Sequence, residues 1–247
     1  MLFGLRIPNP PLSAFVENLW FYEGLTVDHR MERLLPDGAI ELIIDLTDTV
    51  KHIYRPSDFH EIQSCRGSWI SGQHSGHIVI QSAPESSMIG VRFRPAGLHP
   101  FMHFPISELN DQVVDLDLIW KGYVHEIRDR LLEAPTPREK FDILEEMLAR
   151  KAMSFEHDRT LDHVLREIIQ KPAALSIKDL AGDTGMSHRQ LIRNFDGKVG
   201  LKPKALARVF RFNSVLRRIQ GMPAVEWSFV ANDCGYFDQS HFIHDFQ

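Results

Sequence analysis

Cysteine and long apolar runs are scarce in this 247-residue chain. Its two cysteines, Cys65 and Cys234, lie far apart, so the sequence offers neither a disulfide framework nor a zinc-finger spacing. No stretch reaches the roughly 18 apolar residues of a membrane-spanning helix. The N-terminal segment is Pro-rich and lacks the apolar core of a signal peptide. We therefore expect a cytoplasmic protein that is not bound to a membrane.

The sequence also lacks the short motifs of common enzyme classes. It contains no phosphate-binding P-loop, no G-x-G-x-x-G, no G-x-S-x-G and no H-E-x-x-H. Thirteen histidines raise the question of a metal site. The nearest pair, His74 and His77, has the wrong parity for two ligands on one face of a strand, and His99 and His103 lie four residues apart. We predict no catalytic residue, no metal and no cofactor.

Positive charge is low overall but concentrated in one segment. The formal net charge of −5 by itself argues against a nucleic-acid partner. However, residues 1–153 carry a net charge of −7, and residues 154–247 a net charge of +2. Within Ser187–Arg218, nine basic residues stand against one acidic residue, Asp196. Since a solvated helix face usually mixes both signs, this segment predicts a surface that binds double-stranded DNA.

Strand and turn signals dominate the first hundred residues. Pro36-Asp37-Gly38 is a tight-turn signal between two apolar runs. Strands are predicted at Ile40–Leu46, where Glu41 interrupts β-branched residues, and at His77–Ser82 and Ser87–Pro95. Residues 1–104 are therefore predicted to form a β-rich sensing domain.

Three tryptophans and two arginines of the N-terminal part are each open to two interpretations. Trp20, Trp69 and Trp120 are most simply core residues, although a small-molecule pocket would also use aromatic side chains. Arg92 and Arg94 alternate with apolar neighbours, so they face either a ligand cavity or solvent, and solvent is favoured.

Helical spacing begins at about Pro105. Two helices separated by prolines are predicted, and residues 105–153 are interpreted as a helical connector. Residues 154–247 carry helical patterns throughout, with a long helix at Pro203–Gln220 and another starting at Pro223. The apolar stripe predicted for the long helix consists of Leu206, Val209, Phe210, Leu216 and Ile219.

Two C-terminal segments share one design, LAGDTGMSHRQLIRNF at Leu180–Phe195 and VANDCGYFDQSHFIHDF at Val230–Phe246. In each, an alanine precedes a glycine by four residues, and a capping residue precedes apolar residues by four and by eight. A small residue where two helices meet, a glycine turn and an N-cap together predict a helix-turn-helix unit. The structural positions are Ala181, Gly185, Ser187, Leu191 and Phe195 in the first unit, and Ala231, Gly235, Phe242 and Phe246 in the second.

The polar face of the second helix in such a unit enters the DNA major groove. Long donors and acceptors on that face, rather than solvated glutamates, are what base edges and phosphates require. The predicted DNA-binding residues are His188, Arg189, Ile192, Arg193, Lys198, Lys202, Lys204, Gln239, Ser240, Ile243 and His244.

Residues from about 158 to 247 resemble the DNA-binding domain of the AraC/XylS-type bacterial transcription regulators. The residues that match the pattern of this family are Gly200, Pro203, Arg211, Gly235, Gln239, Ser240, His241 and Phe242. The resemblance implies two helix-turn-helix units bridged by the helix Pro203–Gln220. Because the family's pattern continues through another short helix after Gln247, we expect the C-terminus to be truncated.

The N-terminal part is similar, less specifically, to the degenerate cupin-like sensing domains of such regulators, which have lost the metal site. The implied fold class is α+β: a β-rich cupin-like domain with a helical connector, then an all-α DNA-binding domain over residues 154–247. We expect a sequence-specific transcription regulator, a monomer or homodimer, controlled by a small-molecule effector or by association through the N-terminal domain. The alternative is a cupin-type metalloenzyme with a helical appendage.

Overall fold

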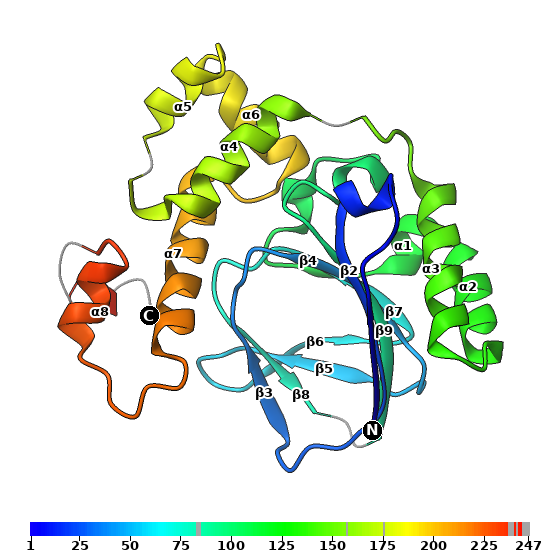
Figure 1. Cartoon of the computed structure of the whole chain (residues 1–247). Helices are drawn as coiled ribbons and strands as arrows, with labels where there is room; N and C mark the ends of the chain where they lie inside the picture. Colours follow the sequence, from blue (N-terminus) through cyan, green and yellow to red (C-terminus); the bar gives the residue numbers. More distant parts are fainter. Residues whose placement is uncertain (83–84, 157, 175, 237–239, 241, 244–247) are drawn as a thin grey trace. The chain divides into compact units, whose positions relative to one another are not determined.

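The structure is a computed structural model that describes residues 1–82, 85–156, 158–174, 176–236, 240 and 242–243. The chain divides into two compact units (Figure 1). The first contains residues 1–157 together with 197–200, and the second contains residues 158–196 together with 201–247. No helix among the described residues is long and apolar enough to cross a membrane.

The first unit contains two antiparallel sheets. One has the strand order β1 (Leu2–Arg6), β2 (Val16–Leu25), β9 (Ser86–Phe93), β4 (Ile40–Asp45), β7 (Ser68–Ser71) and β10 (Val113–Asp115). The other has the order β3 (Met31–Leu34), β8 (Ile78–Gln81), β5 (Lys51–Tyr54) and β6 (Glu61–Cys65). Strands β4, β8 and β9 confirm the three strands that the sequence predicted.

The main core of this unit lies between the six-stranded sheet and three helices, α1 (Leu116–Trp120), α2 (Tyr123–Glu133) and α3 (Pro137–Lys151). Successive side chains of a strand point to opposite faces, so alternate residues of β2, β4 and β9 face these helices. Leu42, Val91 and Leu144 are all fully buried in this cluster. Figure 1 shows the three helices gathered beside one face of the sheet.

The segment after Pro105 differs in part from the predicted helical connector. It begins with a 3-10 turn at Ile106–Leu109, and Val113–Asp115 then form strand β10 rather than helix. Val114 pairs with Ile70 of β7, so the short strand completes an otherwise open sheet edge. Tertiary pairing has therefore overridden the local helical spacing at these three residues.

The second unit consists of helices α4 (Arg159–Gln170), α5 (Ile177–Asp183), α6 (His188–Lys198), α7 (Pro203–Ile219) and α8 (Trp227–Asp233), with a 3-10 turn at Pro172–Ala174. Helix α7 confirms the predicted long helix. The buried stripe of α7 includes Phe212 and Val215, whereas Phe210 and Leu216, which the sequence predicted, are only half-buried. Helix α8 starts at Trp227 and not at Pro223, because Met222 closes a turn on Ile219 before the chain becomes helical again.

Candidate DNA-binding units and interior pocket

Helices α5 and α6 are joined by a turn with a specific hydrogen-bond pattern. The Met186 N–H donates to the Ala181 carbonyl at 3.0 Å, and the Gly185 N–H donates to the Gly182 carbonyl at 3.1 Å. Gly185 has φ of +66°, a left-handed conformation that glycine adopts without strain. These bonds satisfy carbonyls at the end of α5 and redirect the chain into α6.

The turn after α8 repeats this pattern. The Tyr236 N–H donates to the Ala231 carbonyl at 2.9 Å, and the Gly235 N–H donates to the Asn232 carbonyl at 3.0 Å. Gly235 has φ of +77°. Since donors, acceptors and glycine conformation agree at equivalent positions, the two segments are the same structural motif used twice.

A reciprocal capping box fixes the start of α6. The Ser187 hydroxyl accepts from the Gln190 N–H at 3.3 Å, and the Gln190 side-chain oxygen accepts from the Ser187 N–H at 2.8 Å. Two N–H groups that would otherwise lack partners at the helix start are thereby satisfied. Ser176 caps α5 by accepting from the Asp179 N–H at 3.2 Å.

The apolar positions of both units lie in the interior. Leu191 and Phe195 of α6 are fully buried, and Ala181 and Ala231 are buried where their helices meet neighbours. Phe242 is buried against the Tyr236 ring, edge to face, with 5.2 Å between centroids. Phe246 lies outside the described residues.

The opposite face of the first unit is exposed and basic. His188, Arg189 and Arg193 are exposed on α6, and Ile192 and Lys198 are half-buried. At the start of α7, Lys202 and Lys204 are exposed. In the second unit Ser240 and Ile243 are exposed, while Gln239 and His244 lie outside the described residues.

Two arginines of the basic segment instead connect α7 to residues of the second helix-turn-helix unit. The Arg211 guanidinium lies over the Tyr236 ring, 4.3 Å from its centroid. Arg218 donates from Nε to Asp233 on α8 at 2.9 Å. The charge count along the sequence assigned both residues to the basic segment, but their contacts stabilise the packing of the helical unit.

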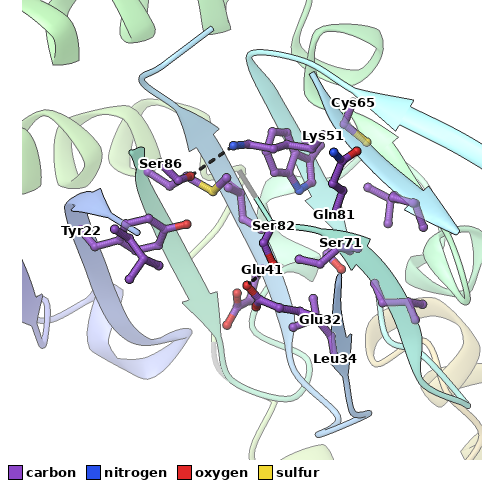
Figure 2. Close-up of a pocket in the computed structure, with 18 of the residues that line it drawn as sticks. Tyr22, Glu32, Leu34, Glu41, Lys51, Cys65, Ser71, Gln81, Ser82 and Ser86 are labelled. Carbon is purple, nitrogen blue, oxygen red and sulfur yellow. Dashed lines mark hydrogen bonds between the residues drawn. The ribbon is translucent and has the colours of Figure 1, made fainter. Parts of the chain in front are cut away.

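The β-rich compact unit, residues 1–157 and 197–200, contains an interior cavity of about 280 Å³ (Figure 2). One wall of this cavity is the face of the six-stranded sheet that is turned away from the helices. Trp20 and Tyr22 of β2 line it, as does Trp69 of β7. The opposing wall includes Ile53 of β5 and Ile80 of β8. Trp20 is therefore a pocket residue, Trp69 both lines the pocket and packs in a buried apolar cluster, and Trp120 packs in the main core.

A glycine makes room for the aromatic part of this pocket. A Cβ at Gly90 would lie only 2.3 Å from Cζ2 of Trp20, so the indole occupies the space that a side chain would fill. The Tyr22 ring is nearly parallel to the Trp20 ring, with 8° between planes and 5.8 Å between centroids. Gly90, Trp20 and Tyr22 thus form a compact aromatic surface on neighbouring strands.

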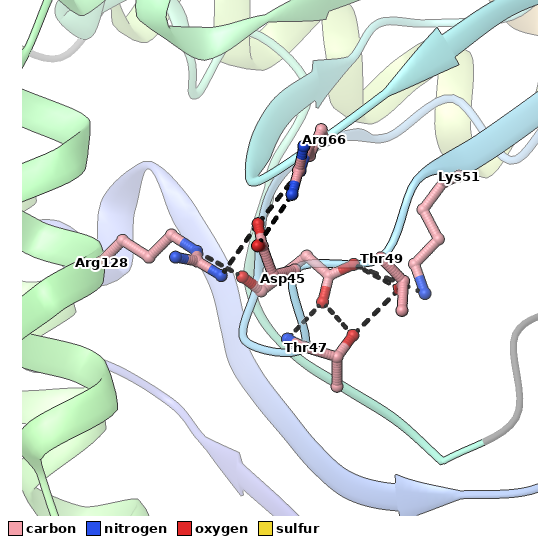
Figure 3. A network of polar contacts seen from close by, with 7 residues as sticks. Asp45, Thr47, Thr49, Lys51, Arg66 and Arg128 are labelled. Atoms are coloured by element: carbon pink, nitrogen blue, oxygen red, sulfur yellow. Dashed lines mark hydrogen bonds and ion pairs between the residues drawn. The ribbon is translucent and has the colours of Figure 1, made fainter.

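Lys51 of β5 places an ammonium group in the pocket wall. Its Nζ donates to the Ser86 hydroxyl at 3.2 Å and lies 3.4 Å from Oδ2 of Asp45. Asp45 is completely buried, and it also accepts from the Thr47 N–H at 2.7 Å and from the Thr49 hydroxyl at 3.3 Å. This buried ion pair is therefore surrounded by hydrogen-bond donors, as Figure 3 shows.

The same network reaches helix α2. Arg128 of α2 donates from Nε to the Asp45 carbonyl at 2.8 Å (Figure 3). Arg66, in the turn before β7, makes two hydrogen bonds to the Asp48 carboxylate at 3.1 and 2.9 Å. Asp45 thus connects the pocket lysine on one side to a helix of the core on the other.

Two glutamates also line the cavity. The Glu41 carboxylate accepts from Arg92 at 2.9 Å, and Arg92 also binds Asp37 at 2.6 Å and Glu17 at 3.1 Å. Burial raises the pKa of Glu41 above its usual value. Arg92 is not among the residues that line the cavity, and its partly exposed side chain contacts three carboxylates from separate segments, while Arg94 is exposed as the sequence favoured.

Glu32 of β3 lines another part of the pocket and accepts from the Ser82 hydroxyl at 2.8 Å. His29 lies 3.3 Å from the same carboxylate. Cys65 lies nearby in the wall, where burial raises the pKa of its thiol to about 11 and keeps it protonated at neutral pH.

Among the described residues, no group of three or more His, Cys, Asp or Glu side chains is arranged to hold a metal ion. His74 instead lies 3.1 Å from the Ser71 hydroxyl, and burial lowers the pKa of its imidazole.

Residues 180–247 match the family model described as a helix-turn-helix domain. The chain carries an AraC-type DNA-binding domain. Residues 180–247 are therefore the DNA-binding part of the chain. Residues 6–115 match a model described as a domain of unknown function. No curated protein matches the sequence.

Three solved structures are among those to which the chain is similar. A ToxT structure from Vibrio cholerae is 10% identical, with 100% of this chain and 94% of that chain covered and a TM-score of 0.47. Unsaturated fatty acid bound ToxT from the same organism is 10% identical, with 88% and 89% covered and a TM-score of 0.41. The AraC-like transcriptional activator CuxR is 13% identical, with 91% and 89% covered and a TM-score of 0.28.

Sequence reasoning located the two helix-turn-helix turns and allowed a pocket role for Trp20 and Trp69, but it did not identify the polar residues of the pocket. The one available signal was Glu41, which interrupts an apolar strand at a position opposite to the core-facing residues. Glu32, Lys51 and Ser86 lie on different strands and come together only through the pairing of the two sheets.

Proposed function

We propose that the exposed face of α6 and the start of α7 bind double-stranded DNA, and that the interior pocket holds a small-molecule effector. The observation that carries the first part is the basic surface on a complete helix-turn-helix turn. Arg189 and Arg193 are exposed on the helix that follows the capped residue Ser187. A helix presented in this way reads base edges in the major groove.

Affinity and specificity come from different residues in this proposal. Lys202 and Lys204 contact phosphates, which position the regulator without reading sequence. Arg189 and Arg193 contact base edges, where an arginine makes paired hydrogen bonds to guanine. The second unit adds contacts from Ser240, Gln239 and His244 in a neighbouring groove.

The effector role of the pocket rests on its size, its shape and its polar groups. A cavity of about 280 Å³ lined by aromatic rings and a few polar side chains is typical of a small-molecule site. A ligand that contacts Lys51 or Ser86 changes the surroundings of Asp45. Since the Asp45 carbonyl accepts from Arg128, occupancy of the pocket is transmitted to helix α2.

The regulator in this proposal acts in the cytoplasm, as a monomer or homodimer, and catalyses no reaction. The effector is bound and released without being chemically altered, and the response is a change in DNA affinity. No cofactor takes part.

The test begins with selection of duplexes from a random DNA pool by the full chain, followed by affinity measurements on the enriched sequence. We expect one enriched motif, and we expect the variant Arg193→Ala to lose preference for it. Arg150→Ala on α3 is the matched control, because it removes an arginine that pairs with Glu146 in the other unit. If no motif is enriched, or if both variants behave alike, the DNA-binding assignment is wrong.

A further inference from the structure

The charges around the interior pocket indicate the chemical class of its ligand. We infer that the pocket takes an organic cation, an ammonium or a similar group carried on an apolar or aromatic body. This inference rests on the proposed role of the pocket as an effector site. Among the described residues that line the cavity, the charged ones are Glu32, Glu41 and Lys51.

The lysine does not provide a free positive charge for an anionic ligand. Its ammonium lies 3.4 Å from the fully buried Asp45 carboxylate and donates to the Ser86 hydroxyl. An incoming carboxylate would compete with Asp45 for this ammonium and would leave that buried carboxylate without its counter-charge. Such a loss is strongly unfavourable, so Lys51 stabilises the wall of the pocket rather than attracting anions.

The glutamates, by contrast, leave a surplus of negative charge. Arg92 is the ion-pair partner of Glu41, but it is shared with Asp37 and Glu17, so one guanidinium faces three carboxylates. Glu32 contacts a hydroxyl and the imidazole of His29. A cation that enters the cavity meets an attractive field from both glutamates, and an anion meets repulsion.

The aromatic rings suit the same ligand. Tryptophan is the aromatic side chain that attracts cations most strongly, and such contacts change affinity by roughly two- to thirtyfold. Trp20 and Trp69 both line the cavity, and the Trp20 indole is held across Gly90 beside the Tyr22 ring. Figure 2 labels Glu32 and Glu41, which belong to strands of the two different sheets that line the cavity. Apolar side chains such as Leu34 and Ile80 provide surface for the body of the ligand.

The experiment compares three probes of similar shape and different charge, 2-phenylethylamine, 2-phenylethanol and 3-phenylpropionate. Binding to the full chain is measured by calorimetry and by the fluorescence of Trp20, with Trp20→Phe to assign the signal. We expect the amine to bind about tenfold more tightly than the alcohol, and the carboxylate to bind more weakly than both. A carboxylate that binds as tightly as the amine overturns the inference but leaves the pocket as an effector site.

Two variants connect the charge preference to named residues. Glu41→Gln and Glu32→Gln keep the shape of each side chain and remove its charge. Each variant should therefore bind the amine about tenfold more weakly and bind the alcohol with unchanged affinity. Glu139→Gln, an exposed residue of α3, is the matched control. Equal losses for amine and alcohol, or no loss in either variant, would show that the glutamates do not select charge. If none of the probes binds, both the inference and the effector role of the pocket are wrong.

Discussion

The two helix-turn-helix units have the same backbone turn but different surroundings. A Cβ at Gly185 would meet no atom within 4 Å, whereas a Cβ at Gly235 would lie 2.1 Å from Cβ of Ala173. The exposed face of the first unit carries Arg189 and Arg193, while the described part of the second carries Ser240 and Ile243. The turn is thus fixed by short-range hydrogen bonds, and what each unit does depends on the side chains around it.

The charge difference between the units predicts the largest effect, a strong salt dependence that originates in the first unit and α7. With roughly six to ten phosphate contacts, DNA affinity should fall by about three to five decades between about 50 and 200 mM salt. The slope of log affinity against log salt is negative. Replacing Lys202 and Lys204 by alanine should reduce the magnitude of this slope by about two. Ser240→Ala is the control and should not change it. Affinity titrations at several salt concentrations decide this, and a slope near zero would contradict the electrostatic part of the account.

The glycine environments predict a difference in stability. Gly185→Ala introduces only the strain of a side chain at a positive φ, which should lower the free energy of unfolding by about 1 kcal/mol. Gly235→Ala meets the same strain and also collides with Ala173, so we expect a total cost of about 2–4 kcal/mol. Denaturant unfolding followed by helical circular dichroism measures both variants. Equal losses would mean that the second turn is not packed against the Pro172–Ala174 turn as described.

The capping box of the first unit predicts a smaller loss. Ser187→Ala removes the hydroxyl that accepts from the Gln190 N–H, and we expect a cost of about 1 kcal/mol. Ser187→Asp keeps an acceptor at the helix start and should retain most of the stability. The same unfolding assay applies. An alanine variant that is as stable as the aspartate variant would show that the cap is not needed for α6.

The ion pair between Arg218 of α7 and Asp233 of α8 predicts the smallest effect. Arg218 and Asp233 are both about half exposed, so water screens their attraction. Arg218→Ala should lower the free energy of unfolding by less than about 1 kcal/mol. A clearly larger loss would assign Arg218 a structural role comparable to that of the buried residues.

The success of sequence reasoning depended on how local each signal was. The alanine, glycine and cap spacing of Leu180–Phe195 lies within one stretch of chain, and the turn formed as predicted. Strand β10 and the role of Arg92 depend instead on which strands pair and in what register. Arg92 is opposite Glu41 in the pairing of β4 with β9, and no local pattern contains that information.

The pocket residues also could not be predicted from local sequence patterns, because strand pairing brings them together. Trp20 and Gly90 are seventy residues apart in the sequence, yet the indole fits only because the residue opposite it on β9 lacks a side chain. The predicted apolar stripe of α7 is right at Leu206 and Val209, which are buried, but wrong at Phe210 and Leu216, since residues spaced three and four apart offer two overlapping faces. Packing against neighbouring helices selected the face with Phe212 and Val215.

The most direct test of the account compares the two recognition helices on a panel of single-base variants of the selected operator. The central claim is that the first unit is the main reader of sequence, because Arg193 is suited to paired contacts with guanine. Arg193→Ala should lose about 1–3 kcal/mol of discrimination at one part of the operator, and Gln239→Ala in the second unit should lose less. A larger loss of specificity from Gln239→Ala than from Arg193→Ala would contradict the account.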